Sequence, residues 1–466
     1  MSTAINFVFK FNNMSSLIQK YNIPGPRYTS YPTVPFWDES LFSIESWKNN
    51  LVNSFKKTNK TEGISLYIHL PFCESLCTFC GCNKRITKRH DVELPYIAAL
   101  LKEWNLYCQL FDEKPIIKEI HLGGGTPTFF SKDNLEILIN GLFEKAIKAV
   151  NYYFSFEGHP NNTTKAHLQK LFDLGFRSVS FGVQDYNYKV QSAIHRIQTF
   201  QQVAKVSFWA KEIGYTSIGH DLIYGLPLQN IETITDTVEK TRAILPDRLA
   251  FYSYAHVPWI KGTGQRGFED TDIPIDDVKR ELYEIGKQKL LQKGYVEIGM
   301  DHFALPKDSL LKASKNGHLH RNFMGYTASK TQVLIGLGVS SISDCWSSFA
   351  QNEKKIETYF ERLEANELPV FRGHILTKKD EIIRKHILNI ICNFSTSWED
   401  DNLKFDELET VLNNLAIMKK DGLVQIFSNS IQVTELGKPF IRNICMAFDL
   451  RMIENRTAHK LFSMTI

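Results

Sequence analysis

The chain has 466 residues with 55 basic and 51 acidic side chains, so its formal net charge is only +4. Charges this balanced and evenly spread exclude a nucleic-acid tail, and no apolar run approaches the ~18–20 residues that a membrane span needs. A chain of this length is too long for a single compact core, so we expect a large domain with a smaller appendage.

The N-terminal part of the chain is predicted to be an extension that precedes the first strand. Its opening residues lack the long apolar core and the small-residue cleavage site of a secretory signal, and Met14 would serve as a start as well as Met1. The stretch IPGPRYTSYPT (23–33) is rich in proline and is expected to be extended, not helical. We assign residues 1–60 to an N-terminal extension that covers the site.

Short β-branched and aromatic runs alternate with helix-length segments between residues 64 and 255. This alternation predicts parallel strands joined by right-handed crossovers. Six units favour an α/β fold, an incomplete (β/α)6 TIM-like barrel, although an open sheet has the same pattern. We assign residues 61–370 to this partial barrel and its extension. The predicted strands are 64–69, 117–122, 152–157, 178–183, 218–223 and 249–254, and the predicted helices are 94–112, 132–148, 165–174, 200–212 and 231–244.

The pattern changes after about residue 370. Helical segments near 379–391 and 405–419 precede two alternating runs around a Ser-Asn-Ser turn at 423–437. This order favours a small, mainly helical, winged-helix-like domain over residues 371–466. Because no basic stripe accompanies it, we favour a lid or structural cap over DNA binding.

Four of the eight cysteines lie between residues 73 and 82. Such clustering favours a metal site in a reducing compartment, here the cytoplasm, over a secreted disulfide framework. The sequence CESLCTFCGC places Cys73, Cys77 and Cys80 at CxxxCxxC spacing. Thiolates suit iron–sulfur clusters and zinc, but structural zinc usually takes two separated pairs of ligands and no second pair appears. Three thiolates leave one iron of a four-iron cluster open to another ligand.

Cys82 follows so closely that one cluster could hardly take all four thiolates without strain. We expect it to line the site without an assigned role, and an incidental loop thiol is an equal alternative.

Polar or glycine-rich residues follow most of the predicted strands, while Glu157 ends the third strand and Asp221 lies in the fifth. Parallel α/β folds place their sites at the carboxyl ends of strands, so we expect these residues to share one face. Each has a simpler explanation when taken singly: a tight turn for the triple glycine, helix capping for Glu157, and ion pairs for the other charged groups. The residues are Gly123–Thr128, Glu157, Gln184, Arg196, Asp221 and Ala255.

The CxxxCxxC loop after a first strand, with Phe79 before the third cysteine, resembles the radical S-adenosylmethionine superfamily. Within it, the chain is similar to the oxygen-independent coproporphyrinogen III oxidases from about residue 21 to its end. Two departures occur: Gly158 and His159 stand where that family often has Asp-Pro-Arg, and Thr78 replaces a frequent aromatic residue. The matching stretches are GPRYTSYPT, CGCNK, GVQDYN, DLIYGLP, YAHVPW, GMDHFA, LHRNFMGYT and IRNICM.

The resemblance implies a [4Fe–4S] cluster on the three cysteines and S-adenosylmethionine, with a second S-adenosylmethionine beside the first. It implies that a 5′-deoxyadenosyl radical takes hydrogen from a substrate propionate, after which loss of CO2 and an electron leaves a vinyl group. Two rounds give protoporphyrinogen IX from coproporphyrinogen III. The residues implied to contact S-adenosylmethionine are Tyr67, Phe79, Gly124, Gly125, Thr126, Glu157, Gln184, Arg196, Asp221, Ala255 and Ile342.

The implied substrate carries four carboxylates, so we expect arginines to anchor it, with Arg27 and Arg321 as candidates. The other implied partner is an electron donor such as flavodoxin or ferredoxin, and we expect a monomer. Two alternatives remain. A haem-binding chaperone of the same branch usually lacks the fourth cysteine and the GPRYTSYPT block, and another radical enzyme, such as a methyltransferase, would give a different product.

Overall fold

The computed structural model describes residues 15–259, 265–455 and 461–466. The alternative start at Met14 and the beginning of the proposed N-terminal extension lie outside these residues. Within them, no helix is both long enough and apolar enough to cross a membrane.

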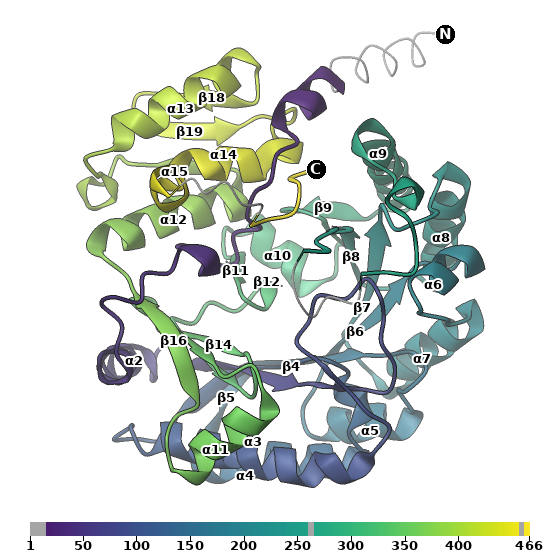
Figure 1. Cartoon of the computed structure of the whole chain (residues 1–466), viewed down its shortest axis with the longest axis vertical. Coiled ribbons are helices and arrows are strands. Elements are labelled where there is room, and N and C mark those ends of the chain that lie inside the picture. Colours follow the sequence, from purple (N-terminus) through teal and green to yellow (C-terminus); the bar gives the residue numbers. More distant parts are fainter. Residues whose placement is uncertain (1–14, 260–264, 456–460) are drawn as a thin grey trace.

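A single curved sheet of twelve strands forms the centre of the molecule (Figure 1). The six predicted strands are present and run parallel, which confirms the incomplete barrel. A seventh parallel strand pairs with the outer edge of the first of them. In sheet order, the parallel strands are β13 (Val333–Leu337), β1 (Ile64–Leu70), β4 (Ile116–Gly124), β5 (Ile147–Gly158), β6 (Ser178–Gln184), β7 (Ser217–Tyr224) and β8 (Arg248–Ser253).

Antiparallel strands extend both edges of this parallel core. They were not predicted, because all have three to six residues and lie between turns. Beyond β13 lie β14 (Ile342–Asp344), β15 (Ser348–Asn352) and β16 (Val370–Ile375), and beyond β8 lie β10 (His302–Ala304) and β9 (Val296–Ile298).

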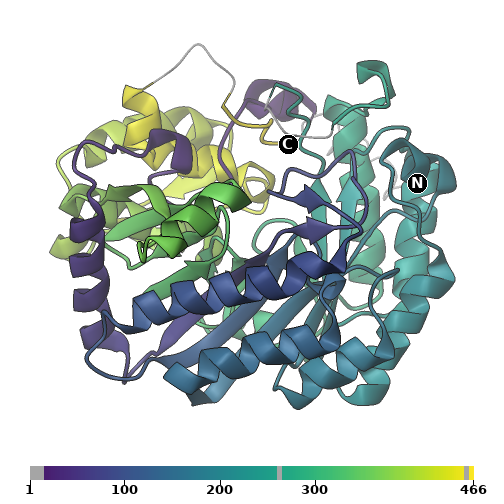
Figure 2. The ribbon, with the colours of Figure 1, turned by 60° about the horizontal axis from the view of Figure 1, so that its bottom comes forward.

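The crossover helices cover the outer face of the sheet (Figure 2). Several begin at a capping side chain directly after the preceding loop, such as Ser131, Thr164, Thr199 and Asn230. The predicted helix 132–148 is too long, because Ala146 is already extended and Ile147 pairs with Ile116. The helices are α3 (Glu93–Cys108), α4 (Lys132–Lys145), α5 (Lys165–Asp173), α6 (Tyr188–Ala193), α7 (Phe200–Ile213), α8 (Ile231–Ile244) and α9 (Asp276–Gln292).

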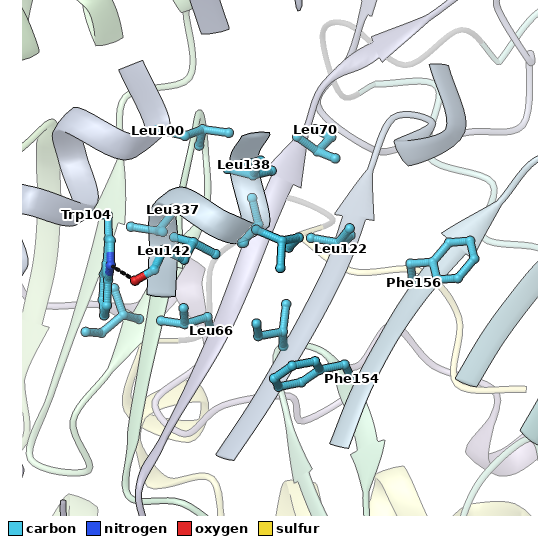
Figure 3. Close-up of a cluster of buried hydrophobic side chains, with 14 of the residues drawn as sticks. Leu66, Leu70, Leu100, Trp104, Leu122, Leu138, Leu142, Phe154, Phe156 and Leu337 are labelled. Atoms are coloured by element: carbon cyan, nitrogen blue, oxygen red, sulfur yellow. Dashed lines mark hydrogen bonds between the residues drawn. The ribbon is translucent and has the colours of Figure 1, made fainter. Parts of the chain in front are cut away.

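Strand alternation separates an apolar outer layer from a polar interior. Leu66 and Leu70 in β1 are fully buried beneath Leu100 and Trp104 of α3 (Figure 3), and the Trp104 indole N–H donates to the carbonyl of Leu142 at 3.0 Å. The intervening residues of β1, β4 and β5 point the opposite way. They are Ser65, Tyr67, His69, Glu119, His121, Ser155 and Glu157.

The C-terminal helices form a second apolar core. The predicted hairpin is present, although a further short strand pairs with it. The elements are α12 (Lys378–Asn393), β17 (Ser395–Ser397), α13 (Leu408–Lys420), β18 (Val424–Ile426), β19 (Ser430–Val433), α14 (Ile441–Phe448) and α15 (Leu450–Glu454). The other helices and strands are α2 (Ile44–Thr58), β2 (Phe72–Cys73), β3 (Arg85–Ile86), α10 (Ser309–Lys315), β11 (His320–Asn322), β12 (Gly325–Thr327) and α11 (Ile356–Glu364).

The N-terminal segment packs into this second core, running beside α14 (Figure 1). The Tyr28 hydroxyl donates to Asp449 at 3.0 Å, and the Arg442 guanidinium donates to the carbonyls of Gly25 and Pro26. Pro24 forms a β-bridge with Met464. The two ends of the chain therefore hold each other over the barrel.

Candidate active site

The cysteine loop is held at the carboxyl ends of β1 and β4. Thr87 N–H donates to the Cys73 carbonyl at 2.9 Å, which pairs β3 with β2. Thr126 N–H donates to the Phe72 carbonyl at 3.0 Å, and Thr78 N–H donates to the Ile194 carbonyl at 3.0 Å. The loop is thus tied to β3, to the glycine-rich segment and to the end of α6.

Cys73, Cys77 and Cys80 line one cavity of about 460 Å³, and Cys82 lines it too. In the described residues no three His, Cys, Asp or Glu side chains converge closely enough to hold a single metal ion. Three thiols spread around one cavity instead fit an iron–sulfur cluster, in which separate irons take separate thiolates.

The thiols differ in their surroundings. Burial raises the pKa of Cys73 to about 11, although Thr126 Oγ1 lies 3.3 Å from its sulfur. The pKa of Cys80 is lowered to about 6, first by a hydrogen bond with Cys82 and then by Lys84. Arg196 Nη1 donates to the Cys77 sulfur at 3.6 Å. Positive charge on this side of the cavity favours the thiolate forms that iron requires.

The glycine-rich segment must approach β1 and β2 closely. A Cβ on Gly125 would lie 2.6 Å from the Pro71 carbonyl, and one on Gly124 would lie 2.8 Å from the His69 ring. Gly124 also has φ +111°, in the left-handed region. Close packing against the chain therefore explains these glycines, and Gly124 and Gly125 line the cavity beside Thr126.

Two carboxylates, Glu157 and Asp221, line the cavity. Glu157 Oε1 lies 3.5 Å from His121 Nε2, and His121 Nδ1 lies 2.8 Å from Ser155 Oγ. Asp221 accepts a hydrogen bond from Ser180 Oγ at 2.9 Å. Burial, followed by repulsion from Glu157, raises the pKa of Asp221 to about 7. The pair presents negative charge that a cationic ligand would neutralise.

Gln184 and Arg196 complete the wall. Gln184 adopts φ +66° at a register shift between β6 and β7, an unfavourable conformation for a residue with a side chain. Arg196 Nη2 donates to the Gly182 carbonyl at 2.7 Å, which fixes its guanidinium beside the cysteine loop. Phe79 lies on the loop itself and also lines the cavity.

Three of the predicted contact residues are not among those that line the cavity. Tyr67 lies behind Gly123, with its hydroxyl 3.1 Å from His69 Nδ1. The Ala255 carbonyl accepts from Gln265 at 2.7 Å, and Gln265 also reaches the Phe79 carbonyl at 3.4 Å. Ile342 packs in a separate apolar cluster in β14.

The predicted substrate arginines contact each other at the carboxyl end of β8, separated from β1 by four strands. Arg27 Nη2 donates to the Ser253 carbonyl at 3.0 Å and lies 3.6 Å from Asp301. Arg321 donates to the Arg27 carbonyl at 3.4 Å. Both arginines therefore lie at the far side of the barrel mouth from the cysteines.

Sequence reasoning missed a second polar cavity of about 190 Å³ inside the barrel. It shares Glu157 and Asp221 with the cysteine cavity. The signal that could have found it is the alternation of side chains within each strand, because every second side chain points into the barrel. Attention to strand ends alone overlooks these positions. The other interior side chains include Glu119, His121, Tyr153, Ser155, Ser180, Arg248, Tyr252 and His302.

Comparison with known proteins matches this geometry. The Radical SAM superfamily matches residues 67–241. Oxygen-independent coproporphyrinogen III oxidase from Synechocystis sp. (strain ATCC 27184 / PCC 6803 / Kazusa) is 35% identical, over 97% of this chain and 98% of that protein. The enzyme of the same name from Escherichia coli (strain K12) is 39% identical, over 93% of this chain and 94% of that protein.

The solved structure of coproporphyrinogen III oxidase from Escherichia coli, a radical SAM enzyme, is also similar. It has a TM-score of 0.85 and 37% identity, and the match covers 91% of this chain and 97% of that one.

A partial parallel barrel with three thiols at the carboxyl ends of its strands defines a radical S-adenosylmethionine protein. More particularly, identities of 35% and 39% along nearly the whole chain show that it belongs to the family of oxygen-independent coproporphyrinogen III oxidases. The resemblance drawn from the motifs is confirmed.

Proposed function

We propose that this protein converts coproporphyrinogen III to protoporphyrinogen IX without oxygen. Two substrate propionates each lose a hydrogen atom, carbon dioxide and one electron, which leaves two vinyl groups. The observation that carries this proposal is the single cavity lined by Cys73, Cys77 and Cys80 in a chain of this family. When bound, a [4Fe–4S] cluster and S-adenosylmethionine supply the one-electron chemistry that removes the hydrogen atom.

In this proposal the three cysteines hold the cluster. Gly124, Gly125 and Thr126 contact the amino group of S-adenosylmethionine, and Phe79 also contacts S-adenosylmethionine. Its cationic groups are balanced by Glu157 and Asp221, which are supported by His121 and Ser180. The remaining contacts are assigned by resemblance to Tyr67, Gln184, Arg196, Ala255 and Ile342.

A second S-adenosylmethionine is part of the proposal. It is supported by the continuity of the two cavities, which share Glu157 and Asp221 as lining residues. Cys82 remains without an assigned role, although its thiol contacts Cys80.

We propose that Arg27 and Arg321 bind substrate propionates. The Arg27 side chain is 29% exposed, and its 3.6 Å contact with Asp301 is long for an ion pair, so it retains N–H groups for another carboxylate. Arg321 supports it by donating to its carbonyl. We also propose residues 1–60 as an extension over the site, 61–370 as the barrel unit and 371–466 as the C-terminal cap.

The test is anaerobic incubation of the reconstituted protein with S-adenosylmethionine, a reductant and coproporphyrinogen III. We expect CO2 release and a product two vinyl groups richer. A haem-binding chaperone would release no CO2, and a methyltransferase would give a product of higher mass. Either result would contradict the proposal.

An electron donor such as flavodoxin or ferredoxin would reach the cluster over a cationic patch, which we define as Lys84, Arg85, Lys88, Arg89, Lys354 and Lys355. The patch joins two distant segments, because Asn83 Nδ2 donates to the Lys354 carbonyl at 2.9 Å and Arg85 pairs with Glu357. It adjoins the site, since Lys84 Nζ donates to the Cys80 carbonyl at 3.0 Å. Such a surface attracts an acidic carrier protein.

We further propose a monomer in the cytoplasm, without a nucleic-acid or membrane partner. All eight cysteines are unpaired, as expected where thiols stay reduced.

A further inference from the structure

A second large cavity, of about 550 Å³, lies at the opposite end of the barrel from the cysteines. Thr61 and Glu62, which precede β1, and Lys118, near the start of β4, form one wall. The segment after β12 and one face of α12 form the others. The cavity thus lies between the barrel and the C-terminal helices, outside the proposed active site.

The cavity has an excess of positive charge. Lys118, Lys330 and Lys385 line it, and within the described part of the chain none of them forms a hydrogen bond or salt bridge. Among the described residues that line the cavity, Glu62 is the one acid, and its carboxylate already accepts the Gln332 N–H at 2.9 Å. Unpaired lysines around one hollow favour an anion.

The side of α12 that faces the cavity is polar. Lys385, Asn389 and Asn393 are spaced four residues apart, so they lie along one face of the helix. The buried Ile383 and Ile387 belong to its apolar core face. A helix of the cap therefore presents one ammonium group and two amides to the cavity.

His320 is the strongest indication of a ligand. It lines the cavity, only 7% of the residue is exposed, and its ring has no hydrogen-bond partner among the described residues. Burial, with the positive charges of Arg384 and Lys330, lowers its pKa to about 3. The ring is therefore neutral and has one N–H to donate. The ring nitrogens of His320 are not fully buried, so they face the open space of the cavity, where a ligand would meet them.

We propose that this cavity binds a small, multiply charged anion, neutralised by Lys118, Lys330 and Lys385 and hydrogen-bonded by His320. Phosphate and carboxylate groups share this chemistry. Because the ligating groups come from the barrel, the β12 loop and α12, the anion would fasten the C-terminal cap to the barrel. The inference is independent of the proposed reaction.

The test uses the full-length, cluster-containing protein and needs no turnover. Anaerobic thermal unfolding and calorimetric titration would be measured with pyrophosphate and citrate in separate arms. We expect at least one of them to bind once per chain and to raise the Tm, because a ligand of the folded state stabilises it. Binding in the pyrophosphate arm alone identifies a phosphate ligand, and binding in the citrate arm identifies a carboxylate ligand.

The variants Lys385→Gln and His320→Gln should each weaken binding about tenfold, the effect of losing one hydrogen bond to a charged group. Lys312→Gln, an exposed lysine of α10 outside the cavity, is the matched control and should bind as the unmodified protein does. Absence of binding in every arm overturns the inference. Binding that is unchanged in both cavity variants also overturns it. If a variant unfolds, the titration of the unmodified protein still shows whether the anion binds.

Discussion

At the scale of single residues, Asp221 is the titrating group that S-adenosylmethionine would meet. Its folded pKa is raised from 3.8 to about 7, so the neutral form predominates below pH 7. A cationic ligand favours the ionised form, so the Kd for S-adenosylmethionine should fall as pH rises from 6 to 8. Titration of one group with this pKa changes the Kd by up to about tenfold between pH 6 and pH 8.

Asp221→Asn should weaken binding at pH 8 and flatten this pH profile. Anaerobic calorimetry at fixed ionic strength measures it, with iron content as the control for folding. If the profile keeps its slope in the variant, another group is responsible.

Arg27 is predicted to act on substrate and not on the cluster. Arg27→Gln should raise the KM for coproporphyrinogen III roughly tenfold, as expected for one charge-assisted hydrogen bond, with unchanged iron content. Steady-state kinetics under anaerobic conditions measure this. An unaltered KM would remove Arg27 from the substrate site.

The sequence predicts this site unevenly, residue by residue. The cysteine ligands lie within eight positions, so their spacing alone defines the loop. Glu157, Gln184 and Asp221 follow from the rule that parallel strands place chemistry at their carboxyl ends. His121 and Ser180 were missed because side chains inside the barrel come together only when the sheet curves, and the sequence does not show that curvature. Ile342 came only from motif resemblance, and it lies in a separate apolar cluster from the cavity.

At the scale of elements, the join between β4 and β2 positions the cysteine loop. Gly125→Ala would drive a Cβ to 2.6 Å from the Pro71 backbone, which cannot move without shifting the strand that carries Cys73. We expect the iron content after reconstitution to fall by half or more. The clash is a case of overpacking, which typically destabilises the folded state by ~1–3 kcal/mol. Iron and sulfide analysis measures this. Wild-type iron content in a folded variant would show that the loop tolerates the shift.

The cationic patch makes a second prediction at this scale. Arg89→Glu with Lys355→Glu should lower turnover driven by flavodoxin or ferredoxin about tenfold at low salt, because it reverses charges that steer an acidic carrier. Turnover driven by dithionite should be unchanged, since a small reductant needs no docking surface. Lys312→Glu is the control. Equal loss with both reductants would place the defect in the active site instead.

Elements were predictable where a run is long and flanked by clear turns. The strands that the sequence indicates have six to twelve residues; they are β1, β4, β5, β6, β7 and β8. By contrast, β9, β10 and β14 have three residues each, too few for an alternating pattern to stand out. These short strands form only because the edges of the parallel core accept them.

At the scale of the whole molecule, the interlock of the two chain ends had no sequence signal. Tyr28 and Asp449 are 421 positions apart, and no local pattern pairs them. The same interlock sets Arg27 against β8 and Asp301. The barrel could thus be predicted from local periodicity, whereas the packing of the two chain ends against each other depends on long-range contacts.

The central claim is that three thiols hold a four-iron cluster and leave one iron for S-adenosylmethionine. The most direct measurement is electron paramagnetic resonance of the reduced, anaerobically reconstituted protein with and without S-adenosylmethionine. The account predicts a four-iron signal that changes on addition of S-adenosylmethionine, is lost in Cys77→Ala, and persists in Cys82→Ala. A signal that is missing, indifferent to S-adenosylmethionine, or retained in Cys77→Ala would contradict it.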